Sequence, residues 1–199
     1  MVINTNTAAA GASRLLSQSS SLLSKSLARL SSGSKIVSPE DDAAGLAQSI
    51  KFDAQINRNS AANANVGNAT SYSQTQDGFL QKVQKSLDRM SELSVLAQDV
   101  TKTTTDLSNY SVEFTQLKNY ISNVGLKEFN GVSLFSTTVL GITIDSDATT
   151  FGMSTVNIGG SLGSAGLSEA YGGISISDSG SAFAALGFIK SAIQNLANM

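Results

Sequence analysis

Apolar residues in the first part of the chain recur at helical spacing. Between Ser13 and Leu30 a seam of leucines repeats at intervals of three, four or seven residues, which places them on one helix face. The seam comprises Leu16, Leu23, Leu27 and Leu30. Many of the intervening residues are serines, which are poor helix formers, so the predicted helix needs a partner. The partner is either another helix of this chain or another subunit, and we favour the subunit. Residues 1 to about 12 are small and polar and are expected to be disordered.

A turn follows the leucine seam. Gly33 suits the left-handed conformation that often follows a helix. Ser38 is expected to cap the next helix, with Pro39 at its first helical position. Asp41 then lies at the capping-box position, and with Asp42 it adds negative charge where the helix dipole favours it. Neighbouring helical residues point about 100° apart, so these two carboxylates are a poor metal or acid–base pair.

A very long helix and a third helix are predicted after this turn. From Glu40 to about Gln98 the apolar spacing continues without a convincing break, although Gly67 and Gly78 each cost about 1 kcal/mol relative to alanine. One continuous helix of this length would extend about 90 Å at 1.5 Å per residue. Residues 101–105 interrupt the pattern, and residues 107–124 resume it. Two such stripes joined by a short polar link predict an antiparallel helical pair that forms a rod.

The pattern changes after Phe129. Asn130-Gly131 is a strong turn signal, and short alternating runs predict strands. The expected strands are residues 132–135, 139–144 and 155–158, with a further candidate at 174–176. Residues 159–181 are rich in glycine and serine and are predicted to be loop. Asp178 or Ser179 then begins a last helix. Its expected apolar face comprises Phe183, Leu186, Ile189, Ile193 and Leu196.

Composition narrows the classes of function. The 199 residues include no cysteine and no histidine, which removes thiol chemistry, disulfides and imidazole catalysis. Charged residues make up 14% and the net charge is −2, so there is no basic surface for nucleic acid. The glycine runs lack the lysine and the strand-to-helix step of phosphate-binding motifs. We expect no cofactor, no metal and no catalytic activity.

The sequence shows neither the pattern of a membrane-spanning segment nor that of a cleavable secretion signal. No run reaches the roughly 18 apolar residues of a membrane span, so membrane insertion is not expected. The N-terminus lacks both a positive region and an apolar region, so no cleavable secretion signal is visible. The residues alone would favour a cytosolic protein.

Several motifs follow one another along the first two thirds of the chain. RLSSG at Arg29–Gly33 is followed by Ile36, Ser38 and DDAAGLA at Asp41–Ala47, and the series continues through Asn59–Asn68, Gln74–Gly78 and Phe129–Val132. These motifs resemble the N-terminal core of bacterial flagellins. The resemblance covers about the first 135 residues and, more weakly, the last 19. Proteins of the junction between hook and filament are similar here, but usually carry a proline after the paired aspartates.

This resemblance implies a mainly α fold of long antiparallel coiled-coil-like helices with a small irregular β-rich outer segment. It also implies export through the channel of the flagellum, an extracellular location, and other flagellin subunits, the export machinery and a chaperone as partners. The turn becomes a joint between the inner and outer parts of the filament, formed by Gly33, Ser38, Pro39, Asp41 and Asp42. The expected segments are an N-terminal filament-core helix (1–34), a helical rod (35–130), a β-rich outer segment (131–180) and the start of a returning helix (181–199).

The stretch around Arg89 and Leu93 resembles the flagellin segment that a toll-like innate immune receptor reads. Glu113 matches the acidic contact of the family on the following helix. An exposed arginine beside an apolar anchor is typical of an interface hot spot. Alternatively, Arg89 pairs with nearby acidic residues and Leu93 packs inside. Ser91 and Asp88 depart from the pattern of the family, which has arginine and glutamine there.

Three classes of function remain for a chain with these patterns. The leading interpretation is a structural filament subunit that assembles through helix packing, with a head-to-tail interface that does not close into a ring. The second is a truncated or divergent relative that acts as a secreted binding or display module. The third, an enzyme using carboxylates, has no converging group of residues. The helical pattern is still running at Met199, which is expected either of a fragment or of a naturally short relative.

Overall fold

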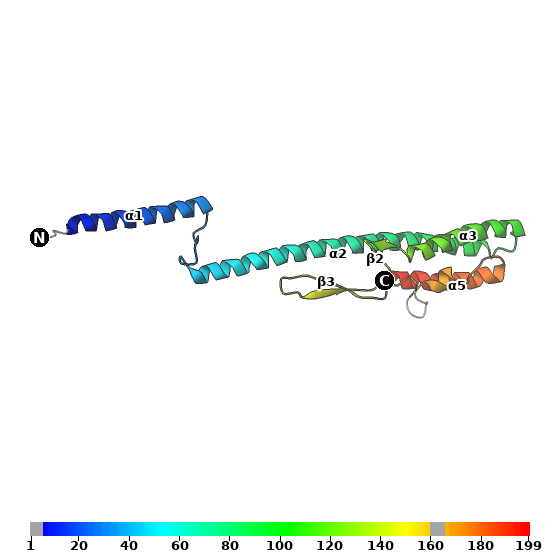
Figure 1. Ribbon diagram of the computed structural model, residues 1–199. Helices are drawn as coiled ribbons and strands as arrows, with labels where there is room; N and C mark the ends of the chain where they lie inside the picture. The colour runs from blue at the N-terminus through cyan, green and yellow to red at the C-terminus, as the bar shows by residue number, and fades with distance from the viewer. Residues whose placement is uncertain (1–5, 160–165) are drawn as a thin grey trace. The chain divides into compact units, whose positions relative to one another are not determined.

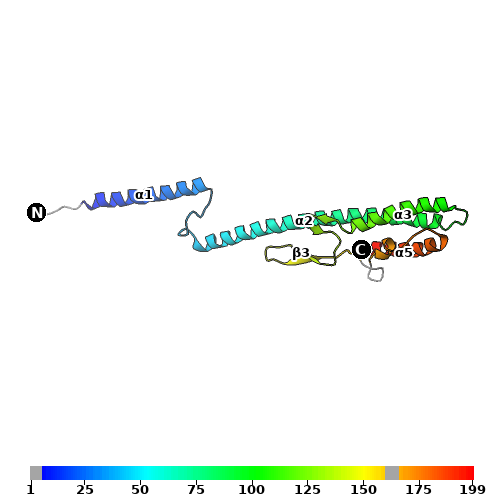
Figure 2. The ribbon, with the colours of Figure 1, turned by 45° about the vertical axis from the view of Figure 1, so that its right-hand side comes forward.

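The computed structural model describes residues 6–159 and 166–199 (Figures 1 and 2). The helices are α1 (Thr7–Ser32), α2 (Ala43–Leu96), α3 (Thr104–Val124), α4 (Ser168–Tyr171) and α5 (Ser179–Ala197). The strands are β1 (Glu128–Phe129), β2 (Val132–Ser133), β3 (Leu140–Thr143) and β4 (Thr150–Met153). The chain divides into an N-terminal unit, Met1–Arg58, and a C-terminal unit, Asn59–Met199. The predicted mainly α fold of long helices with a small β-rich segment is confirmed.

The N-terminal unit holds α1, the turn after it and the beginning of α2. α1 begins at Thr7 because the side chain of Asn6 accepts a hydrogen bond from Ala9 N–H at 3.1 Å. The prediction of disorder up to about residue 12 was therefore wrong from Thr7 onward, and residues 1–5 lie outside the described part of the chain. α1 ends at Gly33, whose φ of 65° is the predicted left-handed conformation. No described residue of this unit is buried.

The second helix begins later than predicted. The assignments of Ser38 as N-cap, Pro39 as first helical residue and Asp41 as capping-box residue were wrong. Ser38 instead closes a separate turn, in which its carbonyl accepts Asp41 N–H at 3.0 Å. Asp42 performs the capping, because its Oδ1 accepts Gly45 N–H at 2.9 Å. The acidic pair therefore does mark a helix start, four positions further along the chain than the first predicted helical residue.

The C-terminal unit contains the hydrophobic core. Figures 1 and 2 both place α3 and α5 alongside the C-terminal part of α2, with α3 antiparallel to it. α2 and α3 supply most of the large buried side chains. The predicted stripes contribute Val83, Leu87 and Met90 from α2 and Phe114, Ile121 and Val124 from α3, and Leu93 of α2, which was not part of the predicted stripe, is buried with them. α3 begins at a capping box, in which Thr103 Oγ1 accepts Asp106 N–H at 3.2 Å and Asp106 Oδ2 accepts Thr103 N–H at 3.0 Å.

α5 begins where the sequence predicts, but the face it presents to the core is only partly the predicted one: Ile189 and Leu196 are buried as expected, whereas Phe183 is not. Its N-cap is Asp178, whose Oδ1 accepts Ser181 N–H at 2.9 Å. The buried stripe comprises Ala182, Ala185, Ile189, Ala192 and Leu196. Phe183, predicted to face inward, is 72% exposed. Alanines project little, so the axis of α5 can approach its neighbours more closely than a phenylalanine stripe would permit.

Two small strand pairs lie in the C-terminal unit, and the predicted positions of the strands were partly wrong. β1 and β2 form an antiparallel hairpin around Asn130 and Gly131, whose positive φ values of 51° and 78° fit the predicted turn. β3 pairs with β4, which the sequence did not indicate. Residues 155–158 and 174–176 are not strands. Their apolar side chains, such as Ile158 and Ile176, enter the core without a partner strand.

The segment predicted as loop at residues 159–181 contains one short helix. α4 lies within it, and Leu167 and Ala170 are fully buried against the rest of the core. Residues 160–165 of this segment lie outside the described part. Lys118 of α3 donates a hydrogen bond to the carbonyl of Ile174 at 2.7 Å, which fixes the chain before α5.

Candidate functional site

The leucine seam of α1 is exposed along its whole length. Leu16, Leu23, Leu27 and Leu30 are between 56% and 81% exposed, and Leu15 and Leu22 beside them are exposed to a similar degree. α1 buries none of its residues. Because large apolar side chains gain free energy when they leave water, this face is a candidate surface for association.

The turn between α1 and α2 gathers charged side chains around Asp41. The Asp41 carboxylate makes ion pairs with Lys25 Nζ and, at 3.3 Å, with Arg29 Nη2. Its side chain is only 5% exposed, whereas both cations lie partly in solvent. The hydrogen bond from Lys25 lowers the pKa of Asp41; burial partly opposes this, and a hydrogen bond from Val37 N–H assists it. The two aspartates therefore have separate tasks, since Asp42 caps α2.

Sequence reasoning missed the roles of three residues beside this turn, of which Arg29 and Gly45 had been named only within motifs. Lys25 and Arg29 are four apart and share one face of α1, but their spacing gave no indication of a partner sixteen and twelve positions away. Gly45 was quoted only as part of a motif. A Cβ at Gly45 would collide with the Asp42 carboxylate and approach Ile36 Cδ1 to 3.1 Å, so a larger residue there would force the capping carboxylate to shift.

Arg89 and Glu113 lie together on the surface where α2 faces α3. Arg89 Nε and Nη2 donate to the two carboxylate oxygens of Glu113 at 2.7 and 3.0 Å, and Nη1 donates to Glu92 at 2.8 Å. The hydrogen bonds from Arg89 lower the pKa of Glu113, and the carboxylates raise the pKa of Arg89. This bidentate arrangement fixes the guanidinium plane while leaving all three side chains partly exposed.

Leu93 does not join this surface. It is fully buried among the core side chains of the C-terminal unit, although it stands one turn from Arg89. The burial of Leu93 fits the alternative prediction, that Leu93 packs inside, and not a role as an apolar anchor at the surface. The reason is helical phase: Leu93 continues the buried stripe of Leu87 and Met90, whereas Arg89 points toward solvent.

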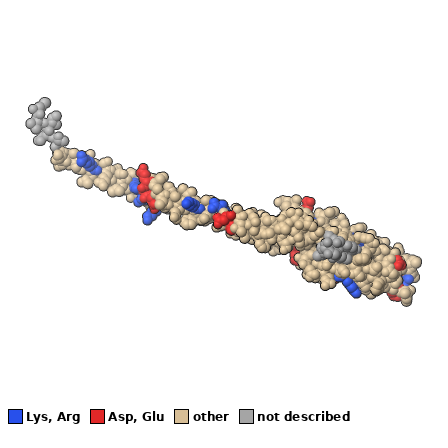
Figure 3. Space-filling view, turned by 90° about the horizontal axis from the view of Figure 1, so that it is seen from below, with Lys and Arg blue, Asp and Glu red and all other residues tan. Residues whose placement is uncertain are grey.

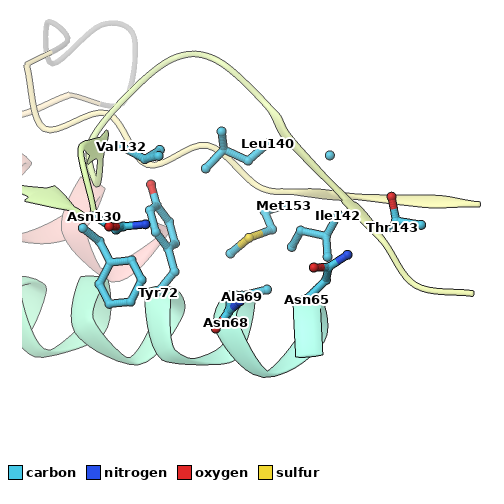
Figure 4. A pocket seen from close by; sticks show the side chains of 12 residues that line it. Asn65, Asn68, Ala69, Tyr72, Asn130, Val132, Leu140, Ile142, Thr143 and Met153 are labelled. Atoms are coloured by element: carbon cyan, nitrogen blue, oxygen red, sulfur yellow. The ribbon is translucent and has the colours of Figure 1, made fainter. Parts of the chain in front are cut away.

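A groove of 660 Å³ lies between α2 and the β3–β4 hairpin (Figure 4). Asn65 and Asn68 from α2 face Leu140, Ile142 and Met153 from the hairpin. Tyr72 closes one side, and its hydroxyl donates to the carbonyl of Ser133 at 2.6 Å. The lining contains no acidic or basic side chain. This groove offers amides, apolar contacts and the Tyr72 hydroxyl, which is already engaged with the Ser133 carbonyl.

The described residues provide no support for a metal site or for a membrane-spanning helix. In residues 6–159 and 166–199, no three His, Cys, Asp or Glu side chains are grouped closely enough to hold a metal ion. None of the helices in that same part of the chain combines the length and apolar character that spanning a membrane requires. On the face shown in Figure 3, charged side chains are sparse and lie between broad uncharged stretches.

These features define a helical protein whose candidate sites are surfaces for contact with other chains. The profile of the bacterial flagellin N-terminal helical region matches residues 3–139, and the chain belongs to the bacterial flagellin family. It is 38% identical over 136 residues to flagellin of Salmonella rubislaw, covering 68% of this chain and 28% of that protein. It is equally similar to flagellin of Serratia marcescens, of which it covers 39%.

A solved structure supports the fold. The crystal structure of Bacillus cereus flagellin aligns with a TM-score of 0.55 at 24% sequence identity, covering 66% of this chain and 76% of that one. The chain thus spans between roughly a quarter and two fifths of the length of these Salmonella and Serratia relatives.

Proposed function

We propose that this chain is a structural subunit of the bacterial flagellar filament and assembles through the exposed leucine seam of α1. The observation that carries the proposal is that membership of the flagellin family coincides with a helix whose leucines are not buried by any described residue of its own unit. Burying one such leucine against another subunit contributes about 1.5–3 kcal/mol. Four seam leucines provide a strong reason for α1 to associate. The proposal assigns a structural role and no catalytic step.

This role also assigns a place in the filament to each segment of the chain. Residues 1–34 form the filament-core helix, residues 35–130 the helical rod, residues 131–180 the outward segment, and residues 181–199 the start of a returning helix. Gly33, Ser38, Pro39, Asp41 and Asp42 form the joint between core and rod. The protein reaches the exterior through the flagellar export machinery with a chaperone, and its principal partners are further flagellin subunits in a homopolymer.

Assembly of seam variants tests the proposal. Purified protein is brought to assembly conditions by added salt and followed by sedimentation and negative-stain microscopy. The parent protein forms fibres, and a Leu23→Ser/Leu27→Ser variant stays in the supernatant. Leu126→Ser is the matched control, because Leu126 is 77% exposed but lies outside α1. Fibres from the seam variant, or equal loss in the control, would reject the seam as the assembly surface.

A second candidate function is display to a toll-like innate immune receptor through Arg89 and Glu113. The observation that favours it is the exposed bidentate pair, which presents a guanidinium in a fixed orientation. Receptor signalling is compared for the parent, Arg89→Ala and Lys85→Ala, the last removing a neighbouring cation that forms no ion pair in the described residues. Loss confined to Arg89→Ala supports the site, and unchanged signalling excludes it. Leu93 contributes only by supporting the helix from within.

A further inference from the structure

The turn after α1 has no hydrophobic core beneath it. Every described residue of the N-terminal unit remains at least partly exposed, so apolar packing does not fix residues 34–42 in place. Most hydrogen bonds in this stretch are local, such as those from Ser34 Oγ to the carbonyl of Ile36 and from Glu40 N–H to Ser38 Oγ. Local bonds shape a turn but do not attach it to the preceding helix.

The most buried charged side chain of this region sits at the same place. The Asp41 side chain is 5% exposed, and its neighbours from α1 are the cations Lys25 and Arg29. A carboxylate removed from water is unfavourable unless opposite charge compensates it. Two cations one helical turn apart, on the same face of α1, provide that compensation.

The remaining charges of the turn do not share this role. From its own segment, Asp41 receives only the backbone N–H of Val37, at 3.4 Å. Asp42 is engaged with Gly45 N–H, and in the described part of the chain neither Lys35 nor Glu40 forms an ion pair. Apart from the local hydrogen bond from Ser34 N–H to Ser32 Oγ at 3.3 Å, the side-chain contacts that connect the turn to α1 are therefore concentrated in one carboxylate.

We propose that Asp41, Lys25 and Arg29 form an electrostatic latch that holds the turn against the last two turns of α1 and opens when the carboxylate loses its charge. The latch acts within one chain and does not depend on filament assembly. Closed, it limits the orientations that α1 samples relative to the first residues of α2. Open, it leaves the turn connected to α1 through the backbone and the local hydrogen bond between Ser34 and Ser32, so the orientation becomes variable. Asp41 is a positioning residue in this device.

Spin-label distances test the latch directly. The chain has no cysteine, so Ser20→Cys on α1 and Ser49→Cys on α2 give a labelled pair without background. Double electron–electron resonance at neutral pH and low salt is expected to give one narrow distance distribution. Asp41→Asn, which keeps the shape and removes the charge, broadens the distribution by about twofold as further orientations become populated.

The control is Glu40→Gln, which changes the net charge by the same amount one residue earlier. It leaves the distribution narrow if the latch is specific to Asp41. Lys25→Gln/Arg29→Gln reproduces the broadening, and adding Asp41→Asn to it broadens no further, because the same interaction is already lost. Roughly 1 M salt, where the Debye length is about 3 Å, opens the latch in the parent protein only partly, because the carboxylate is shielded from solvent.

Three outcomes overturn the proposal. They are a broad distribution in the parent protein, a narrow one in Asp41→Asn, and equal broadening in Glu40→Gln. Circular dichroism of each variant establishes that α1 is still helical. Because no core residue is altered, the fold of the C-terminal unit is retained in all of them. Failure of the latch leaves seam-driven assembly untouched, since the sedimentation test uses different residues.

Discussion

Both units of this chain contain helices with apolar side chains at helical spacing, but this apolar face is exposed in the N-terminal unit and buried in the C-terminal unit. In α1, leucines at helical spacing are exposed along the entire helix. In the C-terminal part of α2, the same kind of spacing produces a stripe that includes the fully buried Leu87 and Leu93. The difference is the presence of partners, because α3 and α5 cover α2 there. Periodicity thus predicts which residues share a face but not what covers that face.

The two units are also expected to differ in stability. A helix of the length of α1 is marginal in water unless its apolar face is covered. The C-terminal unit instead has a contiguous core drawn from α2, α3, α4, α5 and the segments between them. We therefore expect cooperative unfolding from the C-terminal unit and gradual fraying of α1.

Truncating leucines in the two units should give the largest difference. Leu87→Ala removes a fully buried side chain and should lower the free energy of unfolding by about 2–5 kcal/mol, because a cavity remains. Leu23→Ala shortens an exposed side chain and should change it by less than about 0.5 kcal/mol in unassembled protein. Urea denaturation followed by circular dichroism measures both.

The comparison fails if Leu23→Ala destabilises the single chain as much as Leu87→Ala does. That result would mean that α1 is packed in solution, and it would remove the basis for assembly through the seam. Analytical ultracentrifugation of the same samples ensures that both proteins are monomeric during the measurement.

Removing matched N-caps should give an intermediate effect. Thr103→Ala deletes the cap of α3, whose hydroxyl accepts Asp106 N–H, and should cost about 1 kcal/mol of global stability. Asn6→Ala deletes the cap of α1 but should leave the cooperative transition unchanged, with only a loss of helical signal before it. If both variants shift the urea midpoint equally, the two units unfold together and the proposed division is wrong.

Much of the helical framework follows from the sequence. The apolar stripe of α3, the glycine ending α1 and the acidic start of α5 identify elements through local chemistry. The start of α2 was misplaced because Ser38-Pro39 satisfies the same local rules as a true cap, and only the position of Asp42 relative to Gly45 decides between them. β3 lies within the strand predicted at residues 139–144, whereas β4 was missed because its pairing with β3 defines it and not a strong pattern of its own.

The candidate sites were less predictable. Which face of α5 is buried depends on how closely its neighbours approach, which the pattern of Phe183 and Leu186 does not reveal. Arg89 and Glu113 were grouped through family resemblance, whereas the ion pair of Asp41 with Lys25 and Arg29 requires the chain to fold back. Contacts between residues more than ten positions apart on separate elements leave no local signature.

Acidification should give the smallest of the expected effects, a modest loss of stability in the C-terminal unit. In the C-terminal unit the Thr103 hydrogen bonds lower the pKa of Asp106, and the Ser181 hydrogen bonds lower that of Asp178. A carboxylate whose pKa is lower in the folded state stabilises that state above its unfolded pKa of about 4, and this contribution is lost as the pH falls through the folded value. The urea midpoint should therefore be constant from neutral pH to about pH 5 and decrease below about pH 4. Both groups are in solvent, so each contributes little.

The Asp106→Asn variant tests this assignment. Its urea midpoint should decrease less on acidification than that of the parent protein. An Asp106→Asn protein that keeps the full acid dependence would assign the effect to other groups.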